Sequence, residues 1–521
     1  MRHHAWMFLT RRDFLSGAAG LAVLPLAPQG PGGGRAREGE NELLVRRARE
    51  GLRVRLAREP GPAYAERLAG ELSVLTRLGY ALPLLFAADV AQRARQLGIP
   101  LGPGRGAAPG SLVCYALGIT DVDPLPYGLL FERFVNERRP SRPMLQIDVC
   151  ARQRDRLVSE VLATDGASRV AVARRPVGRA TNLVCHAMWA RETDDASREH
   201  TYRFLQRLDE HHEHRLLREA LLCDDALTAL VADNAVVART VAEALQIEDR
   251  LGAFDELWTG CTLVFGKAPL PRVGRDSLTG WQVAPFDGNE AIRGGWDTLS
   301  VAALPGLTIL GGSEATSSEP DEATLHLLAA GDTEGVVGLE APLMRALLRR
   351  SRPRRLEDVV SLLSLDRPGT IEWADEYLDR RHRGVAPVPH RSLTSALAPT
   401  FGLPIYQEQI MQCAADVAGL ELTEADLFRR ALGKKRLADV APWRRRFVAG
   451  AVTRGFAPRE AETIFDFLGA YGGYAVCRAH FVASGLLSLS LAHFKAHSPA
   501  RFHTAVAEGE RGQSSFPGTV G

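Results

Sequence analysis

Apolar residues recur with helical spacing over long stretches of this chain. Hydrophobic positions three or four residues apart run from about Asn41 to Leu97, most regularly in Tyr64–Leu78. The same spacing covers residues 176–252, which are rich in Arg and Glu, and residues 323–508. These segments predict that most of the chain is helical.

Shorter segments between these stretches have the spacing of strands. Residues 144–149 alternate between apolar and polar side chains, and strand-like segments return at Thr262–Phe265 and 296–304. A glycine-dense turn, Gly102–Ser111, precedes the apolar segment Leu112–Leu117. We therefore predict an α/β fold of the mixed α+β type.

The composition is that of a globular protein. Of 521 residues, 45% are hydrophobic and 24% are charged, which excludes a wholly disordered chain. The net charge of +2 is too small to identify an acidic partner. Basic residues gather at Arg345–Arg355 and Arg429–Arg446, where a solvated helix face is a sufficient explanation.

Cysteine usage favours a reducing compartment. The seven cysteines are scattered and form no CxxC pair, which is not the pattern of a disulfide scaffold.

After residue 40 no apolar run is long enough to cross a bilayer, so we expect no membrane span. Residues 28–40 are rich in Gly and Pro and read as a linker, and we expect the tail 511–521 to be disordered.

The N-terminus has the layout of a twin-arginine export signal. Arg11-Arg12-Asp13-Phe14-Leu15 is followed by the small, weakly apolar stretch Ser16–Ala27. A chance match, or a start codon assigned too far upstream, would give the same pattern. Export and a cytoplasmic location both stay open on this evidence.

At the glycine turn the sequence begins to resemble a known family. Gly102–Val113 (GPGRGAAPGSLV), continued by Tyr115–Phe134, is similar to the palm of the bacterial DNA polymerase III alpha subunit, a C-family polymerase. Four later blocks resemble the entry to the fingers, the RPG element, the YQEQ element and the fingers helix with its loop: Gly331–Val336, Arg367–Gly369, Tyr406–Gln409 and Glu424–Lys435. Gly473–His480 (GYAVCRAH) is similar to the family segment GYGFNKSH.

The resemblance implies a nucleotidyltransferase-type palm with a mixed sheet, and a mostly helical thumb and fingers. It places the palm at 41–175 and 253–305, the thumb at 176–252 and the fingers at 306–510, behind a leader and linker at 1–40. We expect neither a PHP domain nor a clamp-binding domain, because no segment matches them.

The positions of the family's catalytic aspartates hold other residues here. Polymerases of this kind use two Mg²⁺ ions about 4 Å apart, held by carboxylates on two strands. At the strand that the family writes PDxDxD, Met144 and Gln146 stand at the metal positions, and the flanking Asp148 is retained. Ser300 stands at the third aspartate position, and Asp297 should face the other side of its strand. We therefore expect no intact catalytic site, no metal site and no cofactor, although the family uses Mg²⁺.

The resemblance also implies residues that contact nucleotide phosphates. A glycine-rich turn exposes N–H groups that can hold a triphosphate, although a purely structural turn is an equal alternative. In the last block Cys477 replaces the family's Asn and Arg478 its Lys, so the charge is kept. The candidate phosphate-binding residues are Arg105, Gly106, Gly110, Ser111, Arg367, Lys434, Lys435, Arg478 and His480.

Three histidines, His211, His212 and His214, lie together in the thumb-like segment. Their spacing puts them on different faces of a helix, which is poorly suited to one shared zinc ion. We interpret them as part of a solvated helix face.

Three functions remain open. The first is a catalytically silent polymerase relative whose partners are primed or single-stranded DNA, a dNTP or a polymerase partner protein. The second is an active, error-prone DNA-directed DNA polymerase of replication or repair with a rearranged metal site. The third is an exported protein that reuses the fold. Lost carboxylates beside retained fingers lysines favour the first.

We predict a cytoplasmic location, because the chain resembles an intracellular polymerase and its scattered cysteines suit free thiols. Residues 1–40 fused to a reporter that works only after twin-arginine export should give no export. Export that is lost on Arg11→Lys with Arg12→Lys would contradict this prediction.

Overall fold

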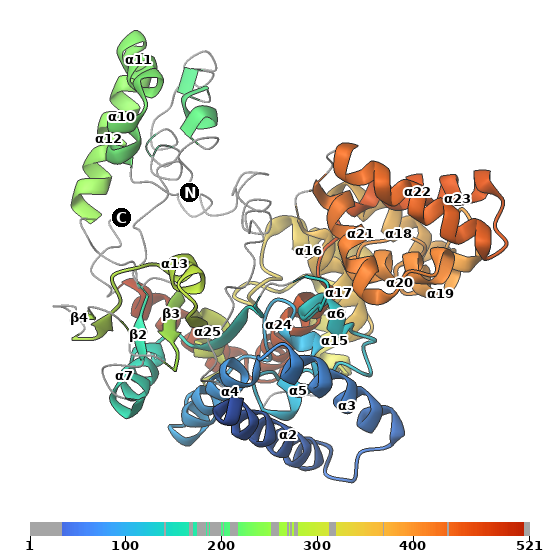
Figure 1. Cartoon of the computed structure of the whole chain (residues 1–521), viewed down its shortest axis with the longest axis horizontal. Helices are drawn as coiled ribbons and strands as arrows, with labels where there is room; N and C mark the ends of the chain where they lie inside the picture. Colours follow the sequence, from blue (N-terminus) through green and yellow to red (C-terminus); the bar gives the residue numbers. More distant parts are fainter. Residues whose placement is uncertain are drawn as a thin grey trace. The chain divides into compact units, whose positions relative to one another are not determined.

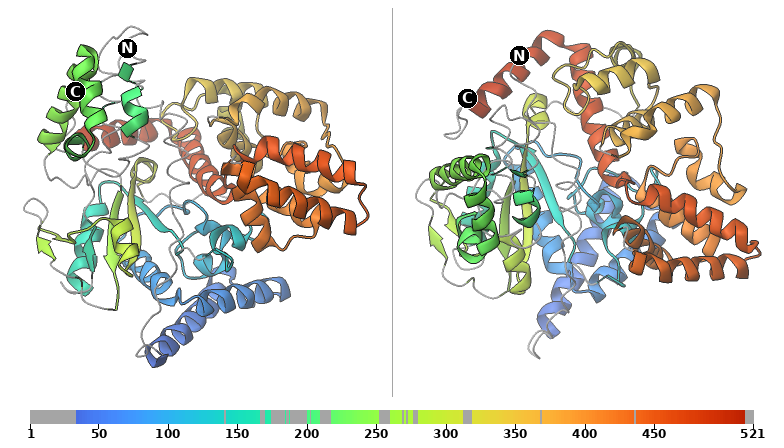
Figure 2. Two further views of the ribbon diagram at one scale, coloured as in Figure 1. Left: turned by 45° about the horizontal axis from the view of Figure 1, so that its top comes forward. Right: turned by 90° about the horizontal axis from the view of Figure 1, so that it is seen from above.

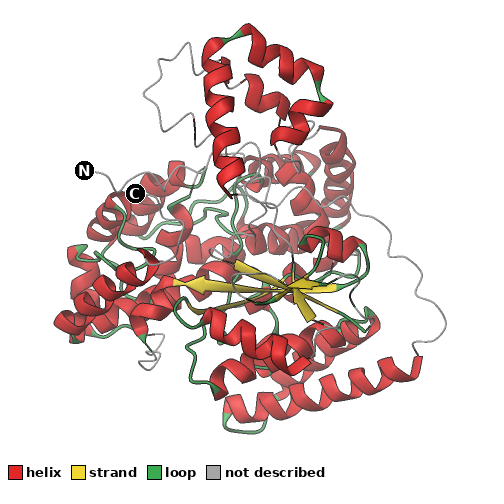
Figure 3. Cartoon of the chain, turned by 90° about the vertical axis from the view of Figure 1, so that its left-hand side faces the viewer, coloured by secondary structure: helices red, strands yellow, loops and turns green. Residues whose placement is uncertain are grey.

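The computed structural model describes residues 34–139, 142–165, 170–173, 184, 187, 200–201, 203–208, 217–251, 260–267, 270, 273–275, 280–311, 319–367, 369–434 and 437–514. Helices make up most of these residues and strands only a small part, which confirms the mixed α/β class (Figures 1 and 3). The chain divides into two compact units, Met1–Val161 with Leu299–Gly521 (unit 1) and Leu162–Thr298 (unit 2).

Unit 1 begins with helices and one short strand. Its first part holds α2 (Gly34–Leu56), α3 (Pro62–Arg77), α4 (Ala81–Gln96), the 3₁₀ turn η1 (Ala108–Gly110), α5 (Leu112–Ala116), α6 (Phe131–Phe134), β1 (Leu145–Cys150) and α7 (Arg154–Asp165), whose last residues belong to unit 2.

The second part of unit 1 is almost entirely helical after one strand. It holds β6 (Asp297–Leu304), α14 (Pro305–Leu310), α15 (Glu322–Ala330), α16 (Pro342–Ser351), α17 (Leu356–Leu365), η2 (Ile371–Trp373), α18 (Ala374–Arg383), η3 (Arg391–Leu393), α19 (Thr394–Leu397), η4 (Ala398–Thr400), α20 (Gln407–Ala418), α21 (Leu422–Lys434), α22 (Leu437–Thr453), α23 (Pro458–Gly472), α24 (Arg478–His497) and α25 (Pro499–Ser514).

Unit 2 combines short strands with a group of helices. Strand β2 pairs with β3 in the antiparallel sense and with β5 in the parallel sense, and β5 pairs with β4 in the antiparallel sense. The elements are β2 (Val170–Val172), α10 (Leu217–Cys223), α11 (Asp225–Asp233), α12 (Ala235–Leu251), β3 (Gly260–Phe265), β4 (Gly274–Arg275), β5 (Gln282–Val283) and α13 (Gly288–Arg293).

Helix α24 lies among other helices of unit 1. It packs against α14, α15, α17 and α25 (Figure 2). Twelve of its 20 residues are buried, and they cover more than one face of the helix. A helix that is apolar on several faces is stable only inside a protein core. The helices α20 to α23 form a second core of their own, around the stacked rings of Phe428 and Phe447.

The glycine turn is held against the rest of unit 1 from two sides. At its start, the Gly102 N–H donates to the Asp148 carbonyl at 2.8 Å, and the Cys150 N–H donates to Pro100 at 3.0 Å. At its end, the Glu71 carboxylate accepts from Ser111 Oγ at 2.7 Å and from the N–H groups of the next two residues at 3.0 and 3.1 Å. The turn is therefore fixed on strand β1 and on helix α3.

Two predicted boundaries differ from the structure. Helix α2 begins at Gly34, so residues 34–40 are not an extended linker; Arg35, Glu38 and Glu40 are good helix formers and continue the helix backwards. Helix α25 runs to Ser514, so residues 511–514 are helical where we expected disorder. The predicted domain boundaries stay predictions, since the two units divide the chain in another way.

Two general expectations can be compared with the described residues. The six cysteines among them are free thiols, as their scatter predicted. No single described helix is long and apolar enough to cross a membrane; α3 and α4 pass that test only as a pair bent by 116°. The export-like residues Arg11 and Arg12, and the three histidines at 211, 212 and 214, lie outside the described residues.

Replacing Glu71 should strongly destabilise unit 1, because Glu71 is 2% exposed and satisfies three donors at the end of the turn. We expect Glu71→Ala to lower the free energy of unfolding by about 3–5 kcal/mol, as for other buried charged groups that lose a partner. Glu66→Ala, an exposed site on the same helix, should change it by less than about 0.5 kcal/mol in the same denaturant titration. Equal effects of the two substitutions would contradict this role for Glu71.

Candidate functional site

Strands β1 and β6 bring the substituted catalytic positions together. The strands run parallel, and Gln146 lies directly opposite Ser300. Asp148, two residues after Gln146, lies on the same face of β1, whereas the buried Leu145 and Ile147 lie on the other. The neighbouring strand position that resemblance assigned to Ser300 therefore agrees with the pairing register.

Met144 belongs to this face, and Asp297 does not. Met144 lies directly before β1, and 73% of its surface is exposed. Asp297 begins β6 and shares a face with the buried Leu299 and Val301, not with Ser300. It is therefore on the wrong side to replace the missing carboxylate.

The retained Asp148 carboxylate is held by protein groups. It is 4% exposed, and Arg105 Nε lies 3.1 Å from each of its two oxygens. Gln146 donates its side-chain amide to the same carboxylate at 3.2 Å. Burial raises the pKa of Asp148, and the Arg105 guanidinium opposes this by favouring the ionised form. The positive charge next to this carboxylate therefore comes from a residue of the protein, Arg105.

These residues do not fit a pair of magnesium ions. Magnesium is a hard cation that is bound through carboxylate and phosphate oxygens. Met144, Gln146 and Ser300 offer a thioether, an amide and a hydroxyl, none of which carries a negative charge. Asp148 is the only carboxylate among these four residues, and it already forms an ion pair with Arg105.

Arg367 and His480 lie close to Arg105, beside the ion pair that Arg105 forms with Asp148. The Gly106 N–H donates to Nδ1 of His480 at 3.3 Å. Burial lowers the pKa of His480 to about 4, and the charges of Arg105 and Arg367 act in the same direction. The ring is therefore neutral at pH 7, in agreement with its role as an acceptor.

Arg367 is the most distinctive member of this group. Its guanidinium lies 5.4 Å above the ring of Phe481, and burial lowers the pKa of the arginine. Its Nε is buried and has no hydrogen-bond partner among the described residues. A desolvated guanidinium with an open donor is suited to a phosphate or carboxylate ligand.

The N-terminus of α24 already holds an anion. The carboxylate of Glu408, which is 4% exposed, accepts from the N–H of Arg478 at 2.9 Å and from that of Ala479 at 3.3 Å. It takes the place that a phosphate would occupy at a free helix start. Arg478 keeps its guanidinium, which lies 5.5 Å from the centre of the Tyr406 ring.

The other predicted phosphate contacts are not in this group. Gly110 and Ser111 are fully buried, and the Ser111 hydroxyl donates to Glu71 while it caps α5. Lys435 lies outside the described residues, and Lys434 ends α21 with its side chain outside them. The structure thus joins Arg105, Gly106, Arg367 and His480, whereas Gly110 and Ser111 are buried and the Ser111 hydroxyl is bonded to Glu71.

The basic runs are only partly solvated. Arg429 is 9% exposed and pairs with Asp426 at 2.5 Å, so it is a buried ion pair and not part of a solvated face. Arg444 and Arg446 pair with Asp466 and Glu424. Arg349, Arg352, Arg354 and Arg445 of these runs are exposed.

Sequence reasoning missed Glu71 and Glu408. Glu408 lies in the YQEQ block, which was noticed for its resemblance and given no role. For Glu71 the available signal was a carboxylate among the apolar positions Leu68, Leu72 and Leu75 of a predicted helix, since such a group needs buried donors. Glu408 stands between two glutamines and gave no such signal.

Comparison with known proteins supports one family over most of the chain. A family model described as the bacterial DNA polymerase III alpha NTPase domain matches residues 42–249. A second model, described as the bacterial DNA polymerase III alpha subunit finger domain, matches residues 314–455.

Curated relatives agree with these two models. The DNA polymerase III subunit alpha of Thermus aquaticus is 35% identical over 481 residues, which cover 87% of this chain and 38% of that protein. The same subunit of Caulobacter vibrioides is 32% identical, with 93% and 43% covered, and that of Escherichia coli K12 is 31% identical, with 92% and 44% covered. The chain spans about two fifths of the length of these relatives.

Acidification should lower the free energy of unfolding, because His480 is neutral in the folded protein. A histidine whose pKa falls from 6.5 to about 4 on folding stabilises the folded state above pH 6.5, and this contribution is lost as the pH falls towards 4. We expect the wild type to lose about 1–3 kcal/mol more unfolding free energy than His480→Asn between pH 7 and pH 4. His326→Asn, at an exposed histidine, should follow the wild type. Parallel curves for all three proteins would contradict the burial of a neutral ring.

Proposed function

Because the chain belongs to the family of bacterial DNA polymerase III alpha subunits, we propose that it binds DNA through this family's core without transferring nucleotides. The observation that carries this proposal is the Arg105–Asp148 pair. It neutralises the retained carboxylate at the place where the resemblance expects metal ions.

The absence of nucleotidyl transfer follows from charge. Two divalent cations bring a charge of +4, which carboxylates must balance in a two-metal site. On the face that holds Met144, Gln146 and Ser300, these three side chains are neutral, and the fourth, Asp148, is paired with Arg105. Arg105 adds a positive charge that repels a cation approaching Asp148. An active polymerase would need carboxylates from elsewhere, and Asp297 lies on the other face.

DNA binding is supported by surface charge in unit 1. Arg349, Arg352 and Arg354 lie at the exposed end of α16 and in the following turn, and Arg445 is exposed on α22. None of these four guanidinium groups is paired with a carboxylate in the described part of the chain. Such arginines can bind phosphates without reading base sequence. Arg367 and the neutral His480 supply a second place for phosphate oxygens.

We also propose a cytoplasmic location. A DNA-binding role requires the chain to meet DNA, and the free thiols of the described residues suit a reducing compartment. The same proposal takes the export-like motif at Arg11-Arg12 to be without function.

We predict salt-dependent binding to primed DNA. Log affinity should fall linearly with log salt, with a slope of about −0.7 to −0.9 for each phosphate that the protein neutralises. Lys434→Gln, Lys435→Gln and Arg445→Gln together should weaken binding equally for different sequences and make the slope shallower by about one for each phosphate that is no longer neutralised. Arg49→Gln, on exposed helix α2, serves as the matched control and should bind as the wild type does.

The same preparation with dNTPs and Mg²⁺ or Mn²⁺ should not extend the primer. Primer extension that disappears on Asp148→Ala would overturn the catalytic part of the proposal. Failure to bind primed or single-stranded DNA at low salt would overturn the binding part and favour an unrelated use of the fold.

A further inference from the structure

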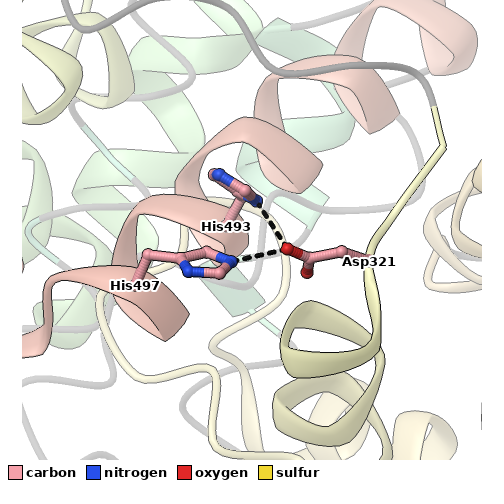
Figure 4. A group of neighbouring side chains, drawn as sticks. All are labelled: Asp321, His493 and His497. Carbon is pink, nitrogen blue, oxygen red and sulfur yellow. Dashed lines mark hydrogen bonds and ion pairs between the residues drawn. The ribbon is translucent and has the colours of Figure 1, made fainter.

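Asp321, His493 and His497 form a compact group in unit 1 (Figure 4). His493 and His497 are four residues apart on α24, so they lie on the same side of the helix. Their ring centres are 4.2 Å apart. Asp321 comes from the residue before α15, which packs against α24.

Both rings are directed at one carboxylate. His497 Nε2 lies 2.6 Å from Asp321 Oδ2, and His493 Nδ1 lies 3.7 Å from the same oxygen. One ligand atom from each of the three residues can be chosen so that all lie within 4.8 Å of one another. Three potential metal ligands from two separate helical segments are therefore close enough to surround a single ion.

A helix cap alone does not explain this arrangement. Asp321 Oδ1 accepts from the Thr324 N–H at 2.9 Å, which is the ordinary N-cap bond of α15. That bond leaves Oδ2 free to face α24. The bond from His497 accounts for one imidazole, but the separation of 3.7 Å from His493 is too long for a second hydrogen bond.

We propose that Asp321, His493 and His497 bind a borderline divalent cation such as Zn²⁺. Two imidazole nitrogens and one carboxylate oxygen, with a water molecule in the fourth position, are a usual set of zinc ligands. Small side-chain rotations would bring the three atoms to bonding distance, since Asp321 and His497 are exposed and His493 is half-buried.

The state of the ligands is suitable for this ion. A carboxylate and neutral imidazoles are the forms in which these side chains bind zinc. The Thr324 hydroxyl lies 3.4 Å from His493 Nδ1, the nitrogen that faces Asp321, so zinc bound at this nitrogen would replace that contact. Zinc would then tie the start of α15 to the C-terminal half of α24, and this role is independent of the proposed polymerase-like function.

The test measures zinc binding to the full-length chain after treatment with EDTA and dialysis. We expect calorimetry to show one tight site, and Co²⁺ to give the visible spectrum of tetrahedral coordination. His493→Ala and His497→Ala should each weaken this site by more than about tenfold, because even outer-shell partners of a metal are worth that much.

Two further variants separate the site from general effects. Asp321→Asn keeps a good N-cap residue and so keeps α15 folded, but it removes the negative charge and should also weaken zinc binding. His326→Ala removes an exposed histidine of α15 and should bind zinc as the wild type does. Zinc should raise the unfolding temperature of the wild type and of His326→Ala, but not of His497→Ala.

Three results would overturn the proposal. One is an absence of tight zinc binding to the wild type. Another is equal weakening by His326→Ala and His493→Ala, which would mean adventitious binding by surface histidines. The third is wild-type affinity in all three site variants, which would place the zinc on other residues.

Discussion

A carboxylate removed from water requires either a proton or a fixed positive charge, and Asp148 has the second. The ion pair with Arg105 depends on the position of the glycine turn, because Arg105 lies within it. The turn in turn depends on two anchors, the backbone bond from Gly102 to β1 and the Glu71 carboxylate on α3. These buried polar contacts therefore determine that a positive charge lies next to Asp148 on strand β1.

The same principle recurs at the other anion-binding positions of unit 1. The start of α5 is occupied by Glu71, and the start of α24 by Glu408. Each helix start could otherwise attract a phosphate, since its N–H groups carry a partial positive charge. Both places are filled by carboxylates of the chain itself, so the proposed phosphate contacts within the described residues are the exposed guanidinium groups and the desolvated Arg367.

Much of the fold could be predicted from the sequence, because periodicity is local. The helices around Tyr64–Leu78 and after residue 323, and the strands that hold Gln146 and Ser300, lie where their spacing placed them. The opposition of Gln146 and Ser300 required the family resemblance in addition.

Long-range contacts could not be predicted in this way. Arg105 and Asp148 are 43 residues apart, and Glu408 and Arg478 are 70 apart, so no local pattern links them. The burial of Ser111 was missed for the same reason, since the residue that takes its hydroxyl lies 40 positions earlier. The helical start at Gly34 was not predicted because the glycines and prolines of residues 28–34 indicate a linker, whereas Arg35, Glu38 and Glu40 favour a helix.

The central claim is that Arg105, and no metal ion, supplies the positive charge that faces Asp148, and Mn²⁺ binding followed by electron paramagnetic resonance tests it most directly. The wild type and Asp148→Asn should bind Mn²⁺ equally. The variant with Met144→Asp, Gln146→Asp and Ser300→Asp should gain a site, because carboxylates then face Asp148 on both strands. A Mn²⁺ site in the wild type that disappears on Asp148→Asn would contradict the account.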